Sequence, residues 1–226
     1  MQKSIIIGDK YPLVGDEEIE EFKDTKYRPR ILCIIQARET SKRFPNKIYA
    51  TLKGVPVLYH VLDRVKRAKL LDDIVVASPH DINVPEGVVN VVPPSEEEDV
   101  LSRYFIVAKG WNADYILRVT SDCPLLDSAL IDFIIYTGIN YQADYCSNVM
   151  VRTFPDGLDA ELISYPALKY LSDTVRDPYH REHVTTFIRE YPDTFDVVSV
   201  ENYKDESHVK WSIDTPKDLQ EIEKIM

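Results

Sequence analysis

Cysteine, long apolar runs and positive charge are all scarce in this sequence of 226 residues. Its three cysteines, Cys33, Cys123 and Cys146, are widely spaced and form no C-x-x-C pair, which argues against a disulfide scaffold and a zinc site. No apolar run approaches the roughly 20 residues that a membrane span needs, and the apolar stretch between Met1 and Ile7 is too short for a signal peptide. We therefore expect a soluble, cytoplasmic protein with no membrane partner.

The charge balance limits the possible partners. Lys and Arg number 27 against 38 Asp and Glu, so the formal net charge is -11. Broad binding to nucleic acid requires many Lys and Arg contacts to phosphate, and this composition therefore argues against a nucleic-acid partner. An anionic ligand must therefore be bound by a few clustered cations or by a metal ion.

The chain divides near Arg30. Residues 1–29 are predicted to form an N-terminal arm with a short strand at Ile5 to Ile7, a turn at Tyr11 to Gly15 and an acidic run from Asp16 to Glu21. The arm is either a solvated extension that adds an edge strand or a segment that docks on a partner subunit. Residues 30–226 are expected to form a single domain, because the chain is 44% hydrophobic and shows no repeat or linker.

Short runs rich in Ile and Val alternate with amphipathic helical patterns along this domain. The runs lack strict alternation, which is typical of strands buried on both faces; they lie at Ile31 to Gln36, Ile74 to Ser78, Val88 to Val92 and Tyr115 to Thr120. Helices are predicted from Pro56, and over Glu97 to Lys109, Ser128 to Ile139, Pro166 to Asp173, His180 to Glu190 and Lys217 to Ile225. The pattern predicts an α/β fold with a mainly parallel sheet and helices on both faces.

A cation-rich loop follows the first strand of the domain. Arg38, Lys42, Arg43 and Lys47 lie where a central parallel strand ends, the edge of such a sheet at which ligands bind, and they would gather a phosphate chain. The loop contains no glycine and is neither a Walker A sequence nor a G-x-G-x-x-G, so backbone amides alone are not expected to hold the phosphates. Taken alone, a basic loop is more often a solvated turn.

The loop is the first of several motifs that occur in a fixed order. They are Ile34 to Arg38 with Ser41, Arg43 to Lys47, Gly54 to Pro56, Ser95 to Tyr104, Arg118 to Asp127, Arg152 to Asp159, Arg181 to Thr185 and Trp211 to Leu219. Together they resemble the sugar cytidylyltransferase family, and most closely its branch of spore coat polysaccharide biosynthesis proteins F. The resemblance covers nearly everything from Arg30 onward. It implies a three-layer α/β/α, Rossmann-like fold of the nucleotide-diphospho-sugar transferase type with a mainly parallel central sheet.

The resemblance also implies that the basic loop binds CTP. Arg38, Arg43 and Lys47 become ligands of the triphosphate, and further nucleotide contacts are expected from Gln36, Ala37, Ser41, Ser121 and Asp122. In related enzymes a glycine often precedes the loop lysine, whereas this chain has Asn46. Asparagine tolerates a left-handed backbone, so we expect the turn to survive.

Two aspartates are candidates for a metal site. Asp122 and Asp214 each follow a predicted strand, and two carboxylates together with phosphate oxygens and water supply the ligands that magnesium prefers. Spacing alone also allows Asp122 to be a turn residue and Asp214 to cap a helix. The resemblance places both at the family's metal-binding positions and thus implies a Mg²⁺ cofactor. Asp127 precedes a helical pattern and is expected to cap it.

A third set is predicted to contact the base and sugar of the nucleotide. Ser95, Asp99 and Arg103 lie at a loop-to-helix boundary at helical spacing, so all three can face one edge of a pocket. Capping by Ser95 and a surface ion pair between Asp99 and Arg103 explain the same spacing. The resemblance favours the nucleotide role, with cytosine as the base.

The acceptor side is predicted around a turn, because turns on a rigid sheet concentrate binding residues. Arg152 and Arg181 are candidates for a bidentate clamp on an acidic acceptor, carboxylate or phosphate. His183 alone would more often be structural or exposed, and the resemblance favours an acceptor role for it without making it a general base. The predicted acceptor set is Asn148, Arg152, Asp156, Asp159, Arg181 and His183.

These residues suggest a Mg²⁺-dependent transfer of CMP from CTP to an acidic sugar or a phosphorylated small molecule, with release of pyrophosphate. Arg38, Lys47, Asp122 and Asp214 are the predicted catalytic set. A glycosyltransferase that uses a nucleotide-sugar donor would share the fold, and a noncatalytic nucleotide-binding subunit is a further alternative. The resemblance also suggests a homodimer.

Overall fold

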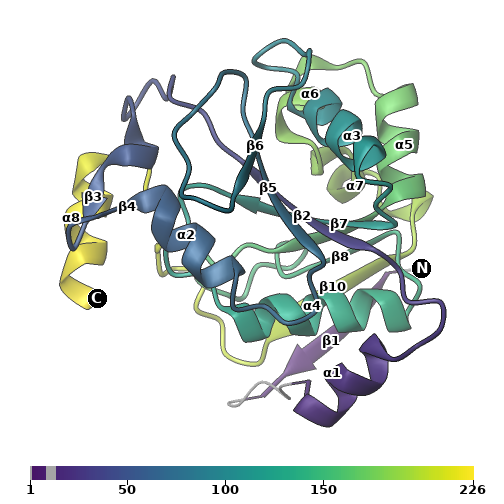
Figure 1. The fold of residues 1–226 in the computed structure, drawn as a ribbon. Helices are drawn as coiled ribbons and strands as arrows, with labels where there is room; N and C mark the ends of the chain where they lie inside the picture. The colour runs from purple at the N-terminus through teal and green to yellow at the C-terminus, as the bar shows by residue number, and fades with distance from the viewer. Residues whose placement is uncertain (1, 9–13) are drawn as a thin grey trace.

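A twisted sheet of eight strands forms the centre of the computed structural model, which describes residues 2–8 and 14–226 (Figure 1). The strand order is β1-β10-β8-β9-β7-β2-β5-β6. Their bounds are β1 Lys3–Ile7, β2 Ile31–Gln36, β5 Asp73–Ala77, β6 Val89–Val91, β7 Tyr115–Thr120, β8 Tyr145–Ser147, β9 Glu161–Ser164 and β10 Val197–Asn202. Strand β9 runs antiparallel to both of its neighbours and every other adjacent pair is parallel, as the predicted fold class requires.

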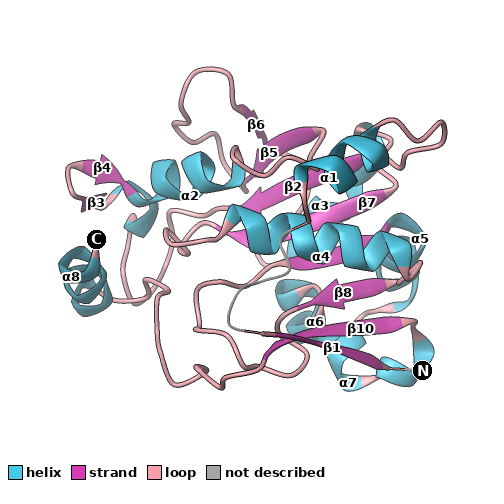
Figure 2. Cartoon of the chain, turned by 90° about the horizontal axis from the view of Figure 1, so that it is seen from below, coloured by secondary structure: helices cyan, strands magenta, loops and turns pink. Residues whose placement is uncertain are grey.

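Helices cover both faces of the sheet. In Figure 1, α2, α4 and α1 lie on one side of it and α3, α5, α6 and α7 on the other; Figure 2 shows α4 crossing the near face. The helices are α1 Asp16–Lys23, α2 Val57–Val65, α3 Val100–Gly110, α4 Ser128–Asn140, α5 Tyr165–Thr174, α6 Pro178–His183, α7 Thr186–Glu190 and α8 Pro216–Ile225, with short 3-10 helices at Lys47–Tyr49 and Pro192–Thr194. No helix in the described ranges has the length and apolar character of a membrane span.

The central strand β2 explains the two-sided core. Ile31, Cys33 and Ile35 pack in the cluster that includes α2 and α4, whereas Leu32 and Ile34 pack in the cluster that includes α3 and α5. All five are fully buried. A strand covered on both faces needs no polar side chain at alternate positions, which is why the sequence shows an unbroken apolar run.

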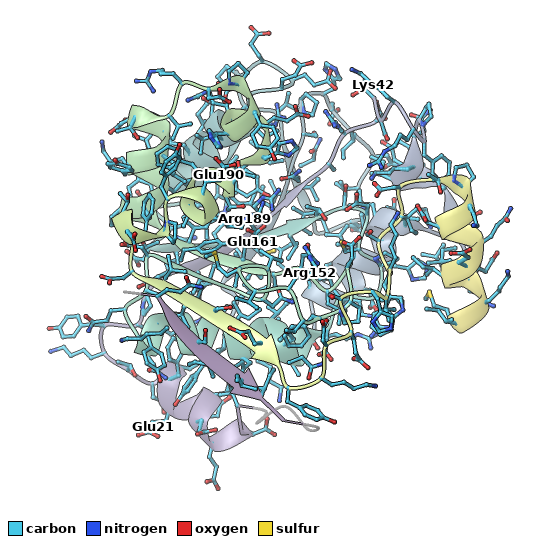
Figure 3. All side chains as sticks on the ribbon, turned by 180° about the vertical axis from the view of Figure 1, so that it is seen from behind. Glu21, Lys42, Arg152, Glu161, Arg189 and Glu190 are labelled. Carbon is cyan, nitrogen blue, oxygen red and sulfur yellow. The ribbon has the colours of Figure 1, made fainter. Side chains whose placement is uncertain are left out.

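The antiparallel strand β9 was not predicted, because it carries a charge in the core. The carboxylate of Glu161, a buried residue labelled in Figure 3, pairs with Arg118 on β7 and accepts a hydrogen bond from the Tyr145 hydroxyl on β8. A buried carboxylate is tolerated only when it is paired and hydrogen-bonded. The short β8 and the later β10 were also absent from the predicted set.

The helix predicted over His180 to Glu190 is wrong as a single element. It is split into α6 and α7 at Val184, a fully buried residue with φ 55° and ψ -62°. The amide of Thr185 donates to the carbonyl of His183 at 2.6 Å across this turn. Hydrophobic spacing continues through the break, so periodicity alone does not reveal it. The other helices and strands for which the sequence predicted a residue range differ from the observed ones only at their ends.

The described part of the N-terminal arm belongs to the same sheet. Strand β1 pairs in parallel with β10 as the edge strand, and Ile7 and Ile19 are buried in the core. The predicted edge strand is therefore confirmed. The predicted turn at Tyr11 to Gly15 falls largely on residues outside the described ranges, and docking on a partner subunit stays a prediction.

Helix α4 approaches the sheet so closely that one glycine has no room for a side chain. A Cβ on Gly138 would lie 2.6 Å from Leu162 and 2.9 Å from Cys146, two residues of the strands beneath. We expect Gly138→Ala to lower the free energy of unfolding by about 1–3 kcal/mol, because overpacking outweighs the gain in helix propensity. Urea unfolding measures this difference.

Gly110 at the end of α3 is the matched control, because a Cβ there meets nothing within 4 Å. Gly110→Ala should leave the stability unchanged or raise it by up to about 1 kcal/mol. Equal destabilisation by the two substitutions would contradict the close contact at Gly138.

Candidate functional site

A cavity of about 760 Å³ opens at the carboxyl ends of β2, β5 and β7. It contains most of the predicted site residues: Gln36, Ala37, Arg38, Ser41, Arg43, Lys47, Arg103, Ser121, Asp122, Asp156, Asp159, His183 and Asp214. Predicted residues that do not line it are Ser95, Asp99, Asn148, Arg152 and Arg181. Ligands of open α/β sheets bind at this edge.

The loop between β2 and Lys47 is closed by a left-handed residue. Asn46 has φ 57° and ψ 25°, and its amide donates to the carbonyl of Glu39 at 2.9 Å. The expectation that asparagine sustains the turn is thus confirmed. As a result, Arg38, Arg43 and Lys47 all line the cavity.

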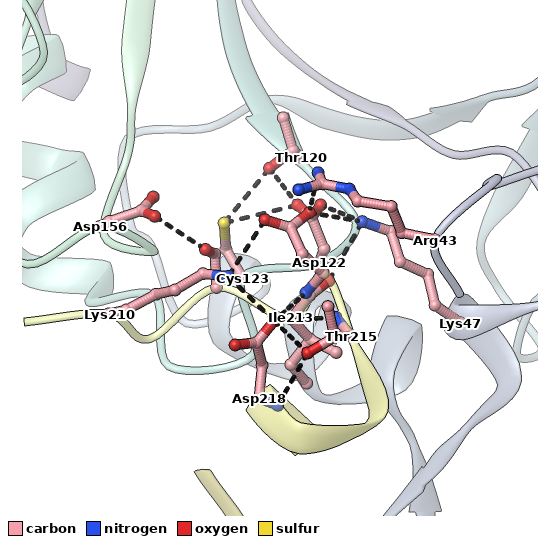
Figure 4. A network of polar contacts seen from close by, with 12 residues as sticks. Arg43, Lys47, Thr120, Asp122, Cys123, Asp156, Lys210, Ile213, Thr215 and Asp218 are labelled. Atoms are coloured by element: carbon pink, nitrogen blue, oxygen red, sulfur yellow. Dashed lines mark hydrogen bonds and ion pairs between the residues drawn. The ribbon is translucent and has the colours of Figure 1, made fainter. Parts of the chain in front are cut away.

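Lys47 lies between two carboxylates (Figure 4). Its side chain is only 12% exposed, and its ammonium donates to the Asp122 carboxylate and to the carbonyl of Ile213, 3.1 Å away. The same nitrogen is 3.6 Å from Asp214 Oδ1. One cation therefore joins three segments that are distant in the sequence.

Asp122 lies two residues after the end of β7 and is held ionised. The hydroxyl of Thr120 donates to its Oδ1 at 2.6 Å, and Lys47 pairs with its Oδ2. Burial by itself would raise the pKa of Asp122, but the Lys47 charge and these hydrogen bonds outweigh it, so the pKa lies below its ordinary value. The carboxylate remains negative at neutral pH.

Asp214 was predicted at the end of a strand, and this is wrong. It lies in the loop before α8, and Thr215, not Asp214, caps that helix. The amide of Ile213 donates to the carbonyl of Asp122 at 2.9 Å, which brings the two loops together without a shared strand. Asp214 is thereby free to pair with Arg43 at 2.8 Å and with Lys210 at 3.2 Å.

By their chemistry, Asp122 and Asp214 are a pair of carboxylates suited to hold a metal ion. Both face one ammonium, so their oxygens already converge on a positive charge. Within residues 2–8 and 14–226, no group of three or more His, Cys, Asp or Glu side chains is placed to hold a metal ion. The protein can therefore supply two carboxylates to magnesium, whose remaining ligands would be phosphate and water oxygens.

The predicted base-contacting set is only partly in the cavity. Asp99 caps α3 by accepting from the amide of Ser102 at 3.1 Å, and it pairs with Arg181 instead of Arg103. Arg103 is buried and donates to the carbonyls of Glu96 and Glu97. Its role is thus partly to fix the segment that precedes α3.

On the acceptor side, Arg152, which is labelled in Figure 3, forms a bidentate and partly exposed pair with Asp159 at 2.8 and 2.7 Å. Asp156 accepts from the hydroxyl of Ser212 at 3.0 Å. Burial raises the pKa of Asp156, and the charge of Asp159 adds to the effect. Asn148 is buried and bonds the backbone of the loop between β8 and β9, so its contacts are structural.

Several cavity residues were not assigned from the sequence. They are Thr40, Ala77, Glu97, Glu98, Val100, Thr120, Cys123, Glu182 and Ser212. Most of them, including Glu182 and Ser212, lie inside the motifs named in the sequence analysis. Their position next to predicted site residues in those motifs could have indicated that they line the cavity. Ala77 is the last residue of β5. Its place in the cavity follows only from the pairing of β5 with β2, which the sequence does not show.

Comparisons with known proteins agree with this geometry. Residues 32–226 match the sequence model of a family described as Cytidylyltransferase. An uncharacterised protein of Methanocaldococcus jannaschii is 36% identical over 200 residues, which span 84% of this chain and 81% of that protein. The spore coat polysaccharide biosynthesis protein SpsF of Bacillus subtilis is 29% identical over 207 residues, spanning 85% of this chain and 84% of SpsF.

A solved structure supports the same relationship. A cytidylyltransferase from Leptospira borgpetersenii aligns with a TM-score of 0.80 and 30% sequence identity, covering 86% of this chain and 85% of that chain. The resemblance and the fold class predicted from the motifs are therefore confirmed.

Asp218 supports the loop that carries Asp214. Its Oδ2 accepts from the amides of Asp214 and Thr215 at 2.9 and 2.8 Å and pairs with Lys210. Burial opposes ionisation, but these donors prevail and lower the pKa of Asp218 from 3.8 to about 2. A depressed pKa contributes stability that is complete above the ordinary value and is lost as the pH falls through the folded-state value.

We therefore expect Asp218→Asn to lower the free energy of unfolding at pH 7 by about 1–2 kcal/mol. The difference from the wild type should shrink as the pH falls from about 4 towards 2. Urea unfolding across that range tests it, with Glu221→Gln on the exposed face of α8 as the control. A difference that does not depend on pH would contradict the role of the ionised carboxylate.

Proposed function

Because the chain belongs to the cytidylyltransferase family, a family of nucleotidyltransferases, we propose that it transfers CMP from CTP to an oxygen of a small-molecule acceptor and releases pyrophosphate. The observation that carries this proposal is the position of Lys47 between Asp122 and Asp214 in a cavity walled by the basic loop. Cations suited to a triphosphate and carboxylates suited to a divalent ion are thus adjacent.

The triphosphate would replace existing ion pairs of the loop. Arg38 is 3.5 Å from Glu182 and Arg43 is 2.8 Å from Asp214, and both arginine side chains are substantially exposed, 46% and 68%. Exposed ion pairs contribute at most about 1 kcal/mol, so phosphate oxygens can displace them. Gln36, Ala37, Ser41 and Ser121 would then complete the nucleotide site.

The proposed cofactor is Mg²⁺, held by Asp122 and Asp214. A divalent ion there would polarise the α-phosphate and neutralise charge on the triphosphate. The chain's own cations act on the same oxygens. Arg38, Arg43 and Lys47 would bind the β- and γ-phosphates and neutralise the charge that develops on the departing pyrophosphate.

Positioning supplies most of the rate in such a transfer, because the reaction needs little covalent help from protein groups. A bond forms between the acceptor oxygen and the α-phosphorus while the bond from that phosphorus to the bridging oxygen breaks. The electron pair leaves with pyrophosphate, and the acceptor proton passes to solvent. A homodimer and a cytoplasmic location stay predictions.

Removing either carboxylate should slow the transfer. We expect Asp122→Asn and Asp214→Asn each to reduce turnover by about a hundredfold or more, on the order of 3 kcal/mol in barrier height. Pyrophosphate release from CTP at limiting magnesium, with a metabolite extract as the source of acceptor, measures this. Asp63→Asn on the exposed face of α2 is the control. Release of a nucleoside diphosphate from a sugar donor, with no pyrophosphate from CTP, would favour a glycosyltransferase instead.

Lys47 should matter for nucleotide affinity as well as for turnover. We expect Lys47→Met to raise the Kd for CTP by about ten- to a hundredfold, because the loss of one charge-assisted hydrogen bond weakens binding by about that factor. Calorimetry with CTP measures the effect without any acceptor, and Lys66→Met beyond the end of α2 is the control. An unchanged Kd would remove Lys47 from the triphosphate site.

A further inference from the structure

The ammonium of Lys47 lies at the point where the two proposed metal ligands converge. It donates to Oδ2 of Asp122, as Figure 4 shows, and is 3.6 Å from Oδ1 of Asp214. An ion that binds both of these oxygens must lie between them. Two cations cannot share that position, because like charges a few ångströms apart repel strongly in a partly buried site. Lys47 and a divalent ion are therefore alternatives at this point.

The carboxylates around this point are neutralised by cations of the chain itself. Arg43 is 2.8 Å from Oδ1 of Asp214, and Lys210 is 3.2 Å from Oδ2 of the same residue. Lys210 also pairs with Asp218 at 2.9 Å. Together with Lys47 on its two aspartates, three cations face three carboxylates. A divalent ion that approaches this arrangement meets little net negative charge.

Two of the three cations are placed to leave for phosphate oxygens. Arg43 and Lys47 line the cavity, whereas Lys210 does not and stays paired with Asp218. The Arg43 side chain is 68% exposed, and the ammonium of a lysine is carried on a flexible four-carbon stem. Charge-assisted hydrogen bonds to a triphosphate can replace the ion pairs of both residues with the aspartates. Their departure leaves the two proposed metal ligands with a net negative charge.

We propose that Lys47 keeps a divalent ion from Asp122 and Asp214 until a triphosphate draws its ammonium away. The nucleotide thereby completes the metal site, and the two ligands bind cooperatively. Because coupling between two sites is reciprocal, the ion raises the affinity for the triphosphate by the same factor. This inference rests on the proposed binding of CTP by the basic loop.

Binding of Mn²⁺ to the protein without nucleotide tests the exclusion of the ion by Lys47. Mn²⁺ takes the same carboxylate and water ligands as Mg²⁺, and its spin resonance signal measures the free ion. We expect Lys47→Met to lower the Kd for Mn²⁺ by about tenfold or more, because the competing charge is removed. Adding Asp122→Asn to this variant should abolish the gain, since the ion then loses one of its two carboxylates.

Lys42→Met is the matched control, because it removes the same charge from another residue of the basic loop that lines the cavity. The charge of Lys42 is exposed and screened, so the Kd for Mn²⁺ should change by less than about twofold. Lys47→Gln is a second test variant that keeps a hydrogen-bond donor for Asp122, and thermal unfolding verifies that each variant folds. An unchanged Kd for Mn²⁺ in the folded Lys47 variants, or an equal gain in Lys42→Met, would overturn the inference.

Calorimetry of the wild-type protein with CTP separates this inference from the proposed function. CTP should bind in EDTA, and Mg²⁺ should lower its Kd. If the wild type binds CTP and releases pyrophosphate while Lys47→Met gains no affinity for Mn²⁺, the inference fails and the proposed function stands. If the wild type binds no CTP with or without Mg²⁺, the proposed function fails and so does the role of the triphosphate in releasing Lys47.

Discussion

The ammonium of Lys47 is the interaction on which the site depends. It joins the start of a 3-10 helix to residues that lie 75 and 166 positions further along the chain. Its positive charge lies between the Asp122 and Asp214 carboxylates and offsets the repulsion between them in a partly buried cavity. The lysine therefore allows both carboxylates to lie close together.

An acidic chain can bind a highly charged anion only if its cations are concentrated. The net charge is -11, yet Arg38, Lys42, Arg43 and Lys47 all lie within one loop at the cavity. The carboxyl ends of parallel strands meet at one edge of the sheet, which collects this loop, the Asp122 loop and the end of β5 in a small volume. Carboxylates of other segments, among them Glu97, Glu98 and Asp156, line the same cavity.

The break between α6 and α7 determines how Glu182 and His183 reach the cavity. Val184 adopts a left-handed φ of 55° although it is β-branched, a conformation that is uncommon and requires support from its surroundings. That support comes from full burial of Val184 and from Arg181, which fastens α6 to the residue that caps α3. Glu182 and His183 are presented to the cavity between these two constraints. Arg181 acts through this geometry and does not touch the cavity itself.

Local information in the sequence determined the α/β class, the central buried strands, the left-handed turn at Asn46 and the family motifs. Each of these depends on neighbouring residues: unbroken Ile and Val runs, asparagine's tolerance of positive φ, and residues at fixed spacing. Tertiary structure decided the rest. Strand β9 exists because Arg118 and Tyr145 satisfy a buried Glu161, and Asp214 reaches Asp122 through a loop contact and not through a strand. The sequence suggests that Arg152 and Arg181 bind an anion, but in the structure they form ion pairs with Asp159 and Asp99. The ion-pair partner of a charged side chain depends on the tertiary structure, because oppositely charged residues from distant segments come within hydrogen-bonding distance only when the chain folds.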